Sequence, residues 1–220
     1  AKFRRSEAEA SDQVGVVNGL AWTSVGGEML EIECAVMTGS GKLKLTGSLG
    51  DVMRESADIA VSYVRTIAEQ YHIDPDFYKT KDLHIHAPEG AVPKDGPSAG
   101  VTMVTAVVSA LSGIPVRGDV AMTGEISLRG RVMPIGGLRE KSMAAYRENK
   151  KIVIIPKENE PDLYEVDPVV KESVVFKPVE RIEEVLELAL VQPPKTEESK
   201  VLDAWCEPKS TSVTGDSVRI

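Results

Sequence analysis

The 220-residue chain is poor in aromatic residues and cysteine, and it carries fewer positive than negative charges. Its 26 lysines and arginines stand against 34 aspartates and glutamates, so the net charge of −8 excludes the basic surface of a nucleic-acid-binding domain. The two cysteines, Cys34 and Cys206, are far apart and form no C-x-x-C pair, which favours a reducing compartment over a disulfide framework. A bridge between them is the less favoured alternative. The longest apolar run, near residues 101–111, is too short to cross a bilayer.

The chain has enough apolar material for one sizeable domain, since 42% of its residues are hydrophobic. Residues 1–13 are charged and polar, without an initiator methionine or the apolar segment of a secretory signal, which predicts a linker from a longer protein. We expect the folded domain at 14–191. Residues 192–220 are polar and predict a solvated tail, in which Trp205 is the one candidate anchor.

Strand and helix patterns alternate along the domain. Apolar spacing and turn residues predict strands at 14–22, 28–37, 42–47, 82–87, 151–156 and 173–179, and two strands within 119–137 around a turn at Arg129 and Gly130. Helices are predicted at 48–71, 99–111, 138–148 and 180–190, the first with Ser48 and Asp51 as a capping box. This alternation predicts an α/β fold of layered mixed sheets with packed helices.

The segment TGSGKLK at 38–44 invites comparison with a phosphate-binding loop. A Walker motif requires glycine five residues before Gly41 and serine or threonine after the lysine, but those positions hold Val36 and Leu43. We therefore predict a hairpin turn here, and no ATP hydrolysis by this chain alone.

His84 and His86 lie two residues apart in a predicted strand, so both side chains emerge on one face, as metal ligands sometimes do. The only other histidine is His72, and no cysteine pair is near. A structural role is therefore favoured, with a metal site as the alternative.

Residues 93–100 read PKDGPSAG and place Ser98 at the start of the predicted helix 99–111. Such a serine is most often a helix cap. The alternative is a nucleophile, because the backbone amides of Gly96, Ser98 and Ala99, with that of Asp95, can face a developing oxyanion at a helix N-terminus.

A serine nucleophile needs a base, and two kinds are available. One is His84 or His86; the other is Lys141, in the first turn of helix 138–148. The partial positive charge of the helix N-terminus disfavours a cation there, but most of the required fall from a pKa of about 10.4 must come from desolvation. The hypothesis thus requires a buried Lys141 next to Ser98, whereas an isolated lysine in this position is usually a solvated surface charge.

Taken together, these segments resemble the proteolytic domain of the Lon family of ATP-dependent proteases in its bacterial form. The resemblance covers about residues 14–190 in order and at family-like spacing. It is carried by VGVVNGLAWTSVGGE, LTGSLGDVMRESA, HIHAPEGAVPKDGPSAGVTM, VAMTGEISLRGRVMPIGGLREK, IPKENEPDL and RIEEVLELAL. Several long motifs in register make coincidence an untenable explanation.

The resemblance implies a role for individual residues. Ser98 of DGPSAG corresponds to the nucleophile and Lys141 of GGLREK to its base, in a Ser-Lys dyad without histidine. Thr123 of MTGE is implied to hold the lysine amine, Asp95 to arrange the site, and Trp22 to lie near the substrate groove. His84 and His86 then become supporting residues, and no metal is expected.

The resemblance also implies an ATP-dependent serine endopeptidase of the cytoplasm that degrades unfolded or damaged polypeptides as a homohexamer. It makes residues 1–13 a linker from a missing upstream ATPase region, where ATP and Mg²⁺ are expected to act, with no cofactor in this domain. Two rivals stay open. One is a hydrolase based on His84 or His86; the other is a substrate-binding and ring-assembly module that does not cleave.

Overall fold

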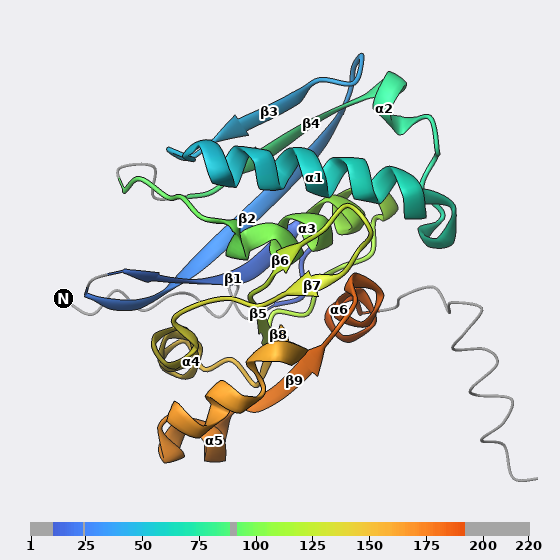
Figure 1. The fold of residues 1–220 in the computed structure, drawn as a ribbon. Coiled ribbons are helices and arrows are strands. Elements are labelled where there is room, and N and C mark those ends of the chain that lie inside the picture. Colours follow the sequence, from blue (N-terminus) through green and yellow to red (C-terminus); the bar gives the residue numbers. More distant parts are fainter. Residues whose placement is uncertain (1–10, 24, 89–91, 192–220) are drawn as a thin grey trace, which may run out of the picture.

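The structure is a computed structural model that describes residues 11–23, 25–88 and 92–191 (Figure 1). The described strands form a seven-stranded sheet in the order β3-β4-β2-β1-β5-β8-β9 and a separate two-stranded sheet of β6 and β7. The strands are β1 (Val16–Thr23), β2 (Gly26–Thr38), β3 (Leu43–Thr46), β4 (Lys81–His86), β5 (Val120–Met122), β6 (Glu125–Ile126), β7 (Val132–Met133), β8 (Ile152–Pro156) and β9 (Val175–Val179).

Six α-helices and four short 3-10 helices belong to the same described part of the chain. The α-helices are α1 (Asp51–Ile67), α2 (Phe77–Thr80), α3 (Gly100–Ser112), α4 (Leu138–Arg147), α5 (Pro168–Ser173) and α6 (Ile182–Ala189). The 3-10 helices are η2 (Ala68–Tyr71), η3 (Pro97–Ala99), η4 (Lys157–Asn159) and η5 (Pro161–Glu165).

The large sheet is mixed. β2 runs antiparallel to both β1 and β4, whereas β3–β4, β1–β5, β5–β8 and β8–β9 are parallel pairs. Helices connect the parallel strands, as crossover connections require. The predicted α/β class with layered mixed sheets is therefore confirmed.

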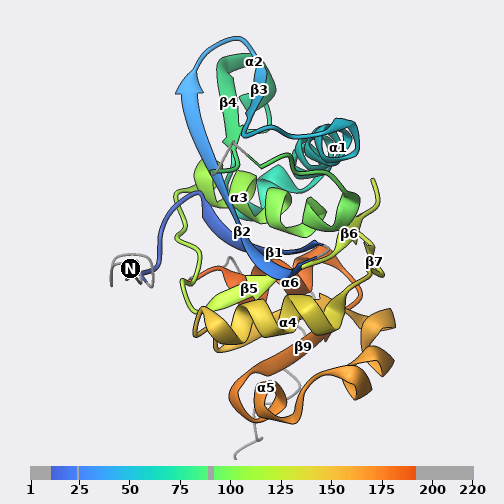
Figure 2. The same cartoon turned by 90° about the vertical axis from the view of Figure 1, so that its left-hand side faces the viewer.

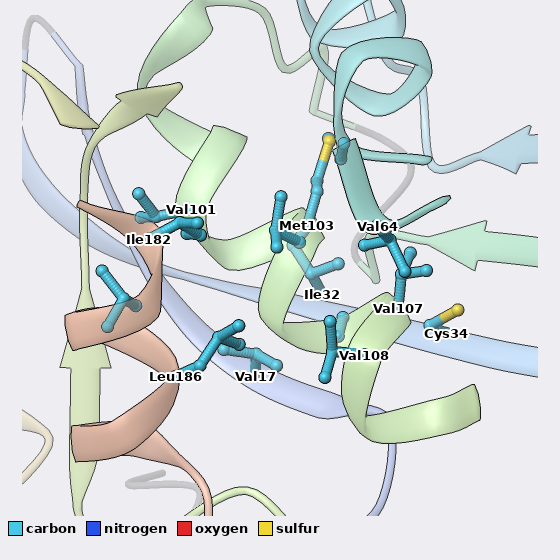
Figure 3. Close-up of a cluster of buried hydrophobic side chains, with 14 of the residues drawn as sticks. Val17, Ile32, Cys34, Val64, Val101, Met103, Val107, Val108, Ile182 and Leu186 are labelled. Carbon is cyan, nitrogen blue, oxygen red and sulfur yellow. The ribbon is translucent and has the colours of Figure 1, made fainter. Parts of the chain in front are cut away.

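Helices cover the sheet on two faces, with β1 and β2 running between α3 and α4 in Figure 2. Side chains alternate along β1, so Val17 joins the core under α1, α3 and α6, and Leu20 joins a second core under α4 and α5. Figure 3 shows the first core, where Val107 and Val108 of α3 lie close to Ile32 and Val17 of the sheet. α3 is buried along most of its length, which explains its nearly continuous apolar sequence.

One glycine in β2 sets the distance between α4 and the sheet. A Cβ atom on Gly27 would lie 1.9 Å from the carbonyl oxygen of Glu140 in α4. The Arg147 guanidinium at the end of the same helix also donates a hydrogen bond to the Gly27 carbonyl. α4 therefore rests directly on the β2 backbone, and this contact fixes the position of Lys141, the next residue after Glu140.

Most predicted elements are found, but the predicted capping box is wrong. α1 begins at Asp51 after Gly50, and no side chain of its N-cap residue caps it, while Ser48 lies outside the helix with a φ of 56°. The helix also ends earlier than predicted and continues as the 3-10 turn η2. Three strands rather than two occupy 119–137, because β5 joins the large sheet and only β6 and β7 form the hairpin.

The predicted hairpin at 38–44 is also wrong. β4 lies between β2 and β3, so the loop joins two strands that are not neighbours. The backbone N–H groups of Ser40 and Lys42 each donate a 2.8 Å hydrogen bond to Oδ1 of Asp82, and these bonds lower the pKa of that carboxyl. A carboxylate of the protein itself thus occupies the amides of this glycine-containing loop.

Several predictions fall on residues that the structure does not describe. They are residues 1–10 of the predicted linker at 1–13, the tail at 192–220 with Trp205, and Cys206. Cys34 is buried with a free thiol, and burial raises its pKa to about 12. Among the described residues, no helix combines the length and apolarity needed to cross a bilayer.

Candidate active site

Ser98 lies in the 3-10 turn η3, immediately before α3. The N-cap residue of α3 is Ala99 and that of η3 is Gly96, so Ser98 is the N-cap residue of neither helix. The prediction that Ser98 is a helix cap is therefore wrong. Ser98 is half-buried, and its hydroxyl makes no hydrogen bond to any residue in the described part of the chain. The side chain is left available for chemistry.

The segment after β5 holds the serine turn through its backbone. The N–H of Gly124 donates a 2.9 Å hydrogen bond to the Ser98 carbonyl, and Thr123 Oγ1 lies 3.5 Å from the same oxygen. The N–H of Val101, in the first turn of α3, donates to the Gly124 carbonyl at 3.1 Å. Strand β5 and the start of α3 are thus locked together where Ser98 enters the site.

Lys141 enters from α4, the helix on the other face of the sheet. Its side chain is 1% exposed, and Nζ donates a 3.1 Å hydrogen bond to Thr123 Oγ1. Burial lowers the pKa of Lys141 to about 8, in the direction that a lysine base requires. Thr123 therefore lies within 3.5 Å of both the Lys141 amine and the Ser98 carbonyl.

A pocket of about 440 Å³ opens over these groups, within the usual range for binding sites. Both Ser98 and Lys141 line it. The other lining residues are Ala21, Trp22, Asp95, Gly96, Pro97, Pro134, Ile135 and Gly136. These other lining residues come from β1, from the turn before α3 and from the segment between β7 and α4, three parts of the chain that are distant in sequence.

Trp22 and Asp95, for which the sequence predicted roles at the site, both line this pocket. Trp22 is 55% exposed, and its indole lies against the backbone of Gly137 at the start of α4. Asp95 Oδ1 accepts hydrogen bonds from the N–H of Gly96 at 2.9 Å and from the N–H of Met53 in α1 at 3.0 Å. The second bond joins the serine turn to the N-terminus of α1.

This geometry changes the expected set of oxyanion donors. Because the Gly96 N–H is bonded to Asp95, it does not face the pocket as a free donor in this structure. Ser98 and Ala99 remain at the start of the helical turn, where the helix dipole favours a developing negative charge.

The histidines lie elsewhere. His84 Nε2 and His86 Nδ1 make hydrogen bonds of 2.9 and 2.8 Å to Thr46 Oγ1 of β3, and neither residue lines the pocket. Among the described residues, no cluster of three or more histidine, cysteine, aspartate or glutamate side chains is arranged to hold a metal. These contacts favour the structural reading of both histidines.

Sequence reasoning missed the pocket wall formed by Pro134, Ile135 and Gly136, and the side chain behind it. Asn159 is 3% exposed and bonds to both backbone groups of Ile135. The sequence drew attention to Asn159 only through the motif IPKENEPDL of the family resemblance. Its partner Ile135 lies 24 residues away, and no local sequence pattern points to that contact.

The amino-acid sequence of the chain was compared with those of known proteins, and it matches one family along most of its length. Residues 1–192 match the family described as the Lon protease (S16) C-terminal proteolytic domain. The matched range contains every pocket residue named above.

Individual relatives agree with this match. The chain is 58% identical over 189 residues to the Lon protease of Bacillus thuringiensis (strain Al Hakam), covering 86% of this chain and 24% of that protein. It is 57% identical over 190 residues to the Lon protease of Clostridioides difficile (strain 630), covering 86% and 24%. It is 56% identical over 193 residues to that of Brevibacillus choshinensis, covering 88% and 25%. The chain thus spans about a quarter of the length of these relatives.

Proposed function

The chain belongs to the Lon protease (S16) C-terminal proteolytic domain family, and from this membership we propose that it cleaves polypeptides with Ser98 as nucleophile and Lys141 as base. One observation carries the assignment of residues: Lys141 is almost completely buried beside the serine turn, with its pKa lowered to about 8. Within the described residues Lys141 has no carboxylate partner, and a buried lysine without one is costly for stability, so a catalytic use is the simplest reason for its presence.

The proposed chemistry begins with neutral Lys141. Its amine takes the proton from Ser98 Oγ as that oxygen forms a bond to the scissile carbonyl carbon. As the tetrahedral intermediate collapses, the C–N bond breaks and the lysine returns the proton to the leaving amine. Water then attacks the acyl-enzyme by the same route, releasing the new carboxyl group and restoring Ser98.

Thr123 has a supporting part in this scheme. Nζ of Lys141 donates to Thr123 Oγ1, so a lone pair of the neutral amine stays available for the proton of Ser98. The intermediate's oxyanion would bind at the amides of Ser98 and Ala99, at the start of the turn that leads into α3. Gly96 would join them only after its N–H leaves Asp95.

We further propose, for the whole protein, ATP-dependent degradation of unfolded or damaged polypeptides by a cytoplasmic homohexamer. ATP and Mg²⁺ would act in an ATPase region outside this chain, to unfold and thread substrates. Peptide hydrolysis itself balances with water alone and needs no cofactor in this domain. The support is the name and greater length of the related Lon proteases.

The decisive experiment compares cleavage of an unstructured polypeptide by the whole protein and by its Ser98→Ala form, with fragments identified by mass spectrometry. Loss of cleavage in the variant is expected, and equal cleavage by both would refute the mechanism. Replacing Lys141, His84 and His86 separately tests the histidine-based hydrolase. That rival requires cleavage to be lost when a histidine is replaced and to persist when Lys141 is replaced. A module that binds without cleaving would never form an acyl-enzyme.

A further inference from the structure

A buried asparagine stands behind one wall of the serine pocket. Asn159 ends the short helix η4, just after strand β8, and its side chain reaches the backbone of Ile135. Asn159 Oδ1 accepts the Ile135 N–H at 2.9 Å, and Nδ2 donates to the Ile135 carbonyl at 2.8 Å. One carboxamide therefore binds both polar groups of a single pocket residue.

The orientation of this carboxamide is fixed by its partners. An N–H group can only donate and a carbonyl can only accept, so Oδ1 must face the first and Nδ2 the second. The remaining hydrogen of Nδ2 is donated to Oδ2 of Asp162 at 2.6 Å. Asp162 therefore holds Asn159 in place against Ile135.

This contact determines what the pocket wall presents. The N–H and C=O of one residue lie on the same side only when the backbone is extended, and the groups of its neighbours then point the opposite way. With Ile135 turned toward Asn159, the Pro134 carbonyl and the Gly136 N–H are directed away from it. Neither has a hydrogen-bond partner within the described part of the chain, and both residues line the pocket with Ser98.

We propose that Asn159 is a positioning residue that holds the Pro134–Gly136 wall extended, so that this wall binds the backbone of an extended polypeptide beside Ser98. The substrate would add to the wall as a short strand, accepting from the Gly136 N–H and donating to the Pro134 carbonyl. Recognition through backbone groups alone suits a site that accepts many sequences. This inference rests on the proposed function, because it assigns the substrate-binding part of the same site.

The test measures binding separately from cleavage. A short unstructured peptide carrying fluorescein is titrated by fluorescence anisotropy with the whole protein in its Ser98→Ala form, which cannot turn it over. Adding Asn159→Ala is expected to weaken binding about tenfold, because the wall loses its fixed geometry and the peptide its backbone partners. Thermal unfolding and amide hydrogen exchange at Ile135 verify that the variant is folded and has lost the contact.

Asn18→Ala is the matched control. Asn18 is half-buried, and its Nδ2 donates to the carbonyls of Gly118 and Val120 at 3.4 and 3.3 Å, but it does not line the pocket. It should change peptide binding by no more than about twofold. Asn159→Asp adds a second signature, since its carboxylate would repel the Ile135 carbonyl and Asp162. Binding should then recover at acidic pH, where a protonated carboxyl group can donate as the amide does.

Three outcomes would overturn the inference: unchanged binding with Asn159→Ala, an equal loss with Asn18→Ala, or no peptide binding by the Ser98→Ala parent. Labelling of Ser98 in the unmutated protein by a small fluorophosphonate tests the proposed function independently. Absence of that labelling counts against the serine mechanism but leaves the binding result to decide the role of Asn159. Asn18→Ala should change the labelling rate by less than about twofold, because Asn18 does not line the pocket.

Discussion

The carboxylate of Asp95, in the serine turn, caps helix α1 from outside. It accepts the N–H of Met53, 42 residues earlier in the chain, at 3.0 Å, and this is one of the amides that a helix leaves unpaired at its N-terminus. Gly50, the N-cap residue of α1, has no side chain to do so, and a Cβ there would lie 2.4 Å from Asp95 Cγ. The start of α1 and the conformation of the serine turn are therefore one structural unit.

Asp95→Ala should release both the α1 amide and the Gly96 N–H. We expect a loss of about 1 kcal/mol in the free energy of unfolding, as for other helix caps, and about a tenfold slower reaction of Ser98 with a fluorophosphonate. Asp95→Asn keeps an oxygen acceptor and should restore most of both. The measurements are thermal unfolding and intact-protein mass spectrometry.

Asp51→Ala is the control, because this exposed residue also places a negative charge in the first turn of α1 but belongs to the helix itself. It should lower stability by a few tenths of a kcal/mol and leave the reactivity of Ser98 unchanged. A variant of Asp95 as reactive as the unmutated protein would show that the cap does not shape the serine turn.

Thr123→Val should slow cleavage by roughly 10- to 100-fold with little change in KM. The substitution keeps the shape of the side chain but removes the acceptor that holds the Lys141 amine, so the base loses its position in the transition state. Thr123→Ser should recover much of the rate. Thr105→Val is the matched control, because that buried hydroxyl donates within α3 to the Val101 carbonyl at 2.8 Å. Equal losses of kcat in both variants would reduce Thr123 to a general packing residue.

The pH dependence of cleavage follows from Lys141. Only the neutral amine can accept the proton of Ser98, and its pKa is lowered to about 8 by burial. The rate of Ser98 acylation should therefore rise with pH and level off above about pH 8. Measurement of acylation by a fluorophosphonate between pH 6 and 10 tests this. A flat profile would contradict Lys141 as the base.

The same residue should make stability depend on pH. Its pKa is about 8 in the folded chain and 10.5 in the unfolded chain, so between these values the unfolded state binds more protons. Stability from this group therefore rises with pH across that interval, and the cost of the buried charge is fully present below about pH 8. Lys141→Met should be more stable at pH 7, by on the order of 2 kcal/mol, and should lose this pH dependence. Urea unfolding at pH 7 and pH 10 measures both effects.

Much of the fold could be predicted because its signals are local. The apolar run of α3 and the alternation in β4 each determine an element without reference to the rest of the chain. The insertion of β4 between β2 and β3 could not be predicted in this way, since strand order depends on which distant segments pair. The prediction of the α1 cap was wrong for the same reason, because the capping side chain is the distant Asp95 and not the neighbouring Ser48.

In the candidate site, too, the residues in local sequence motifs could be predicted, whereas the features that depend on distant contacts could not. Ser98, Lys141, Thr123 and Trp22 lie in glycine-rich segments with a recognisable pattern, and the structure brings them to one region. The burial of the Lys141 side chain could not be deduced from its place in a helix, because that burial depends on the packing of α4 against β2. The role of Asn159 depends on a backbone that no sequence pattern marks.

The close contact between α4 and the β2 backbone can be tested for its effect on the position of Lys141. In Gly27→Ala, the added methyl group would meet the Glu140 carbonyl, so α4 must move away from the sheet and carry Lys141 with it. We expect a loss of about 2 kcal/mol in stability, as for overpacked cores, together with a fall in Ser98 acylation while the protein is still folded. Gly136→Ala is the control, because its Cβ would meet nothing within 4 Å, and it should change stability by less than about 0.5 kcal/mol. If Gly27→Ala destabilised the protein but acylated at the normal rate, the position of Lys141 would not depend on this contact, and the amine would have to be held by Thr123 alone.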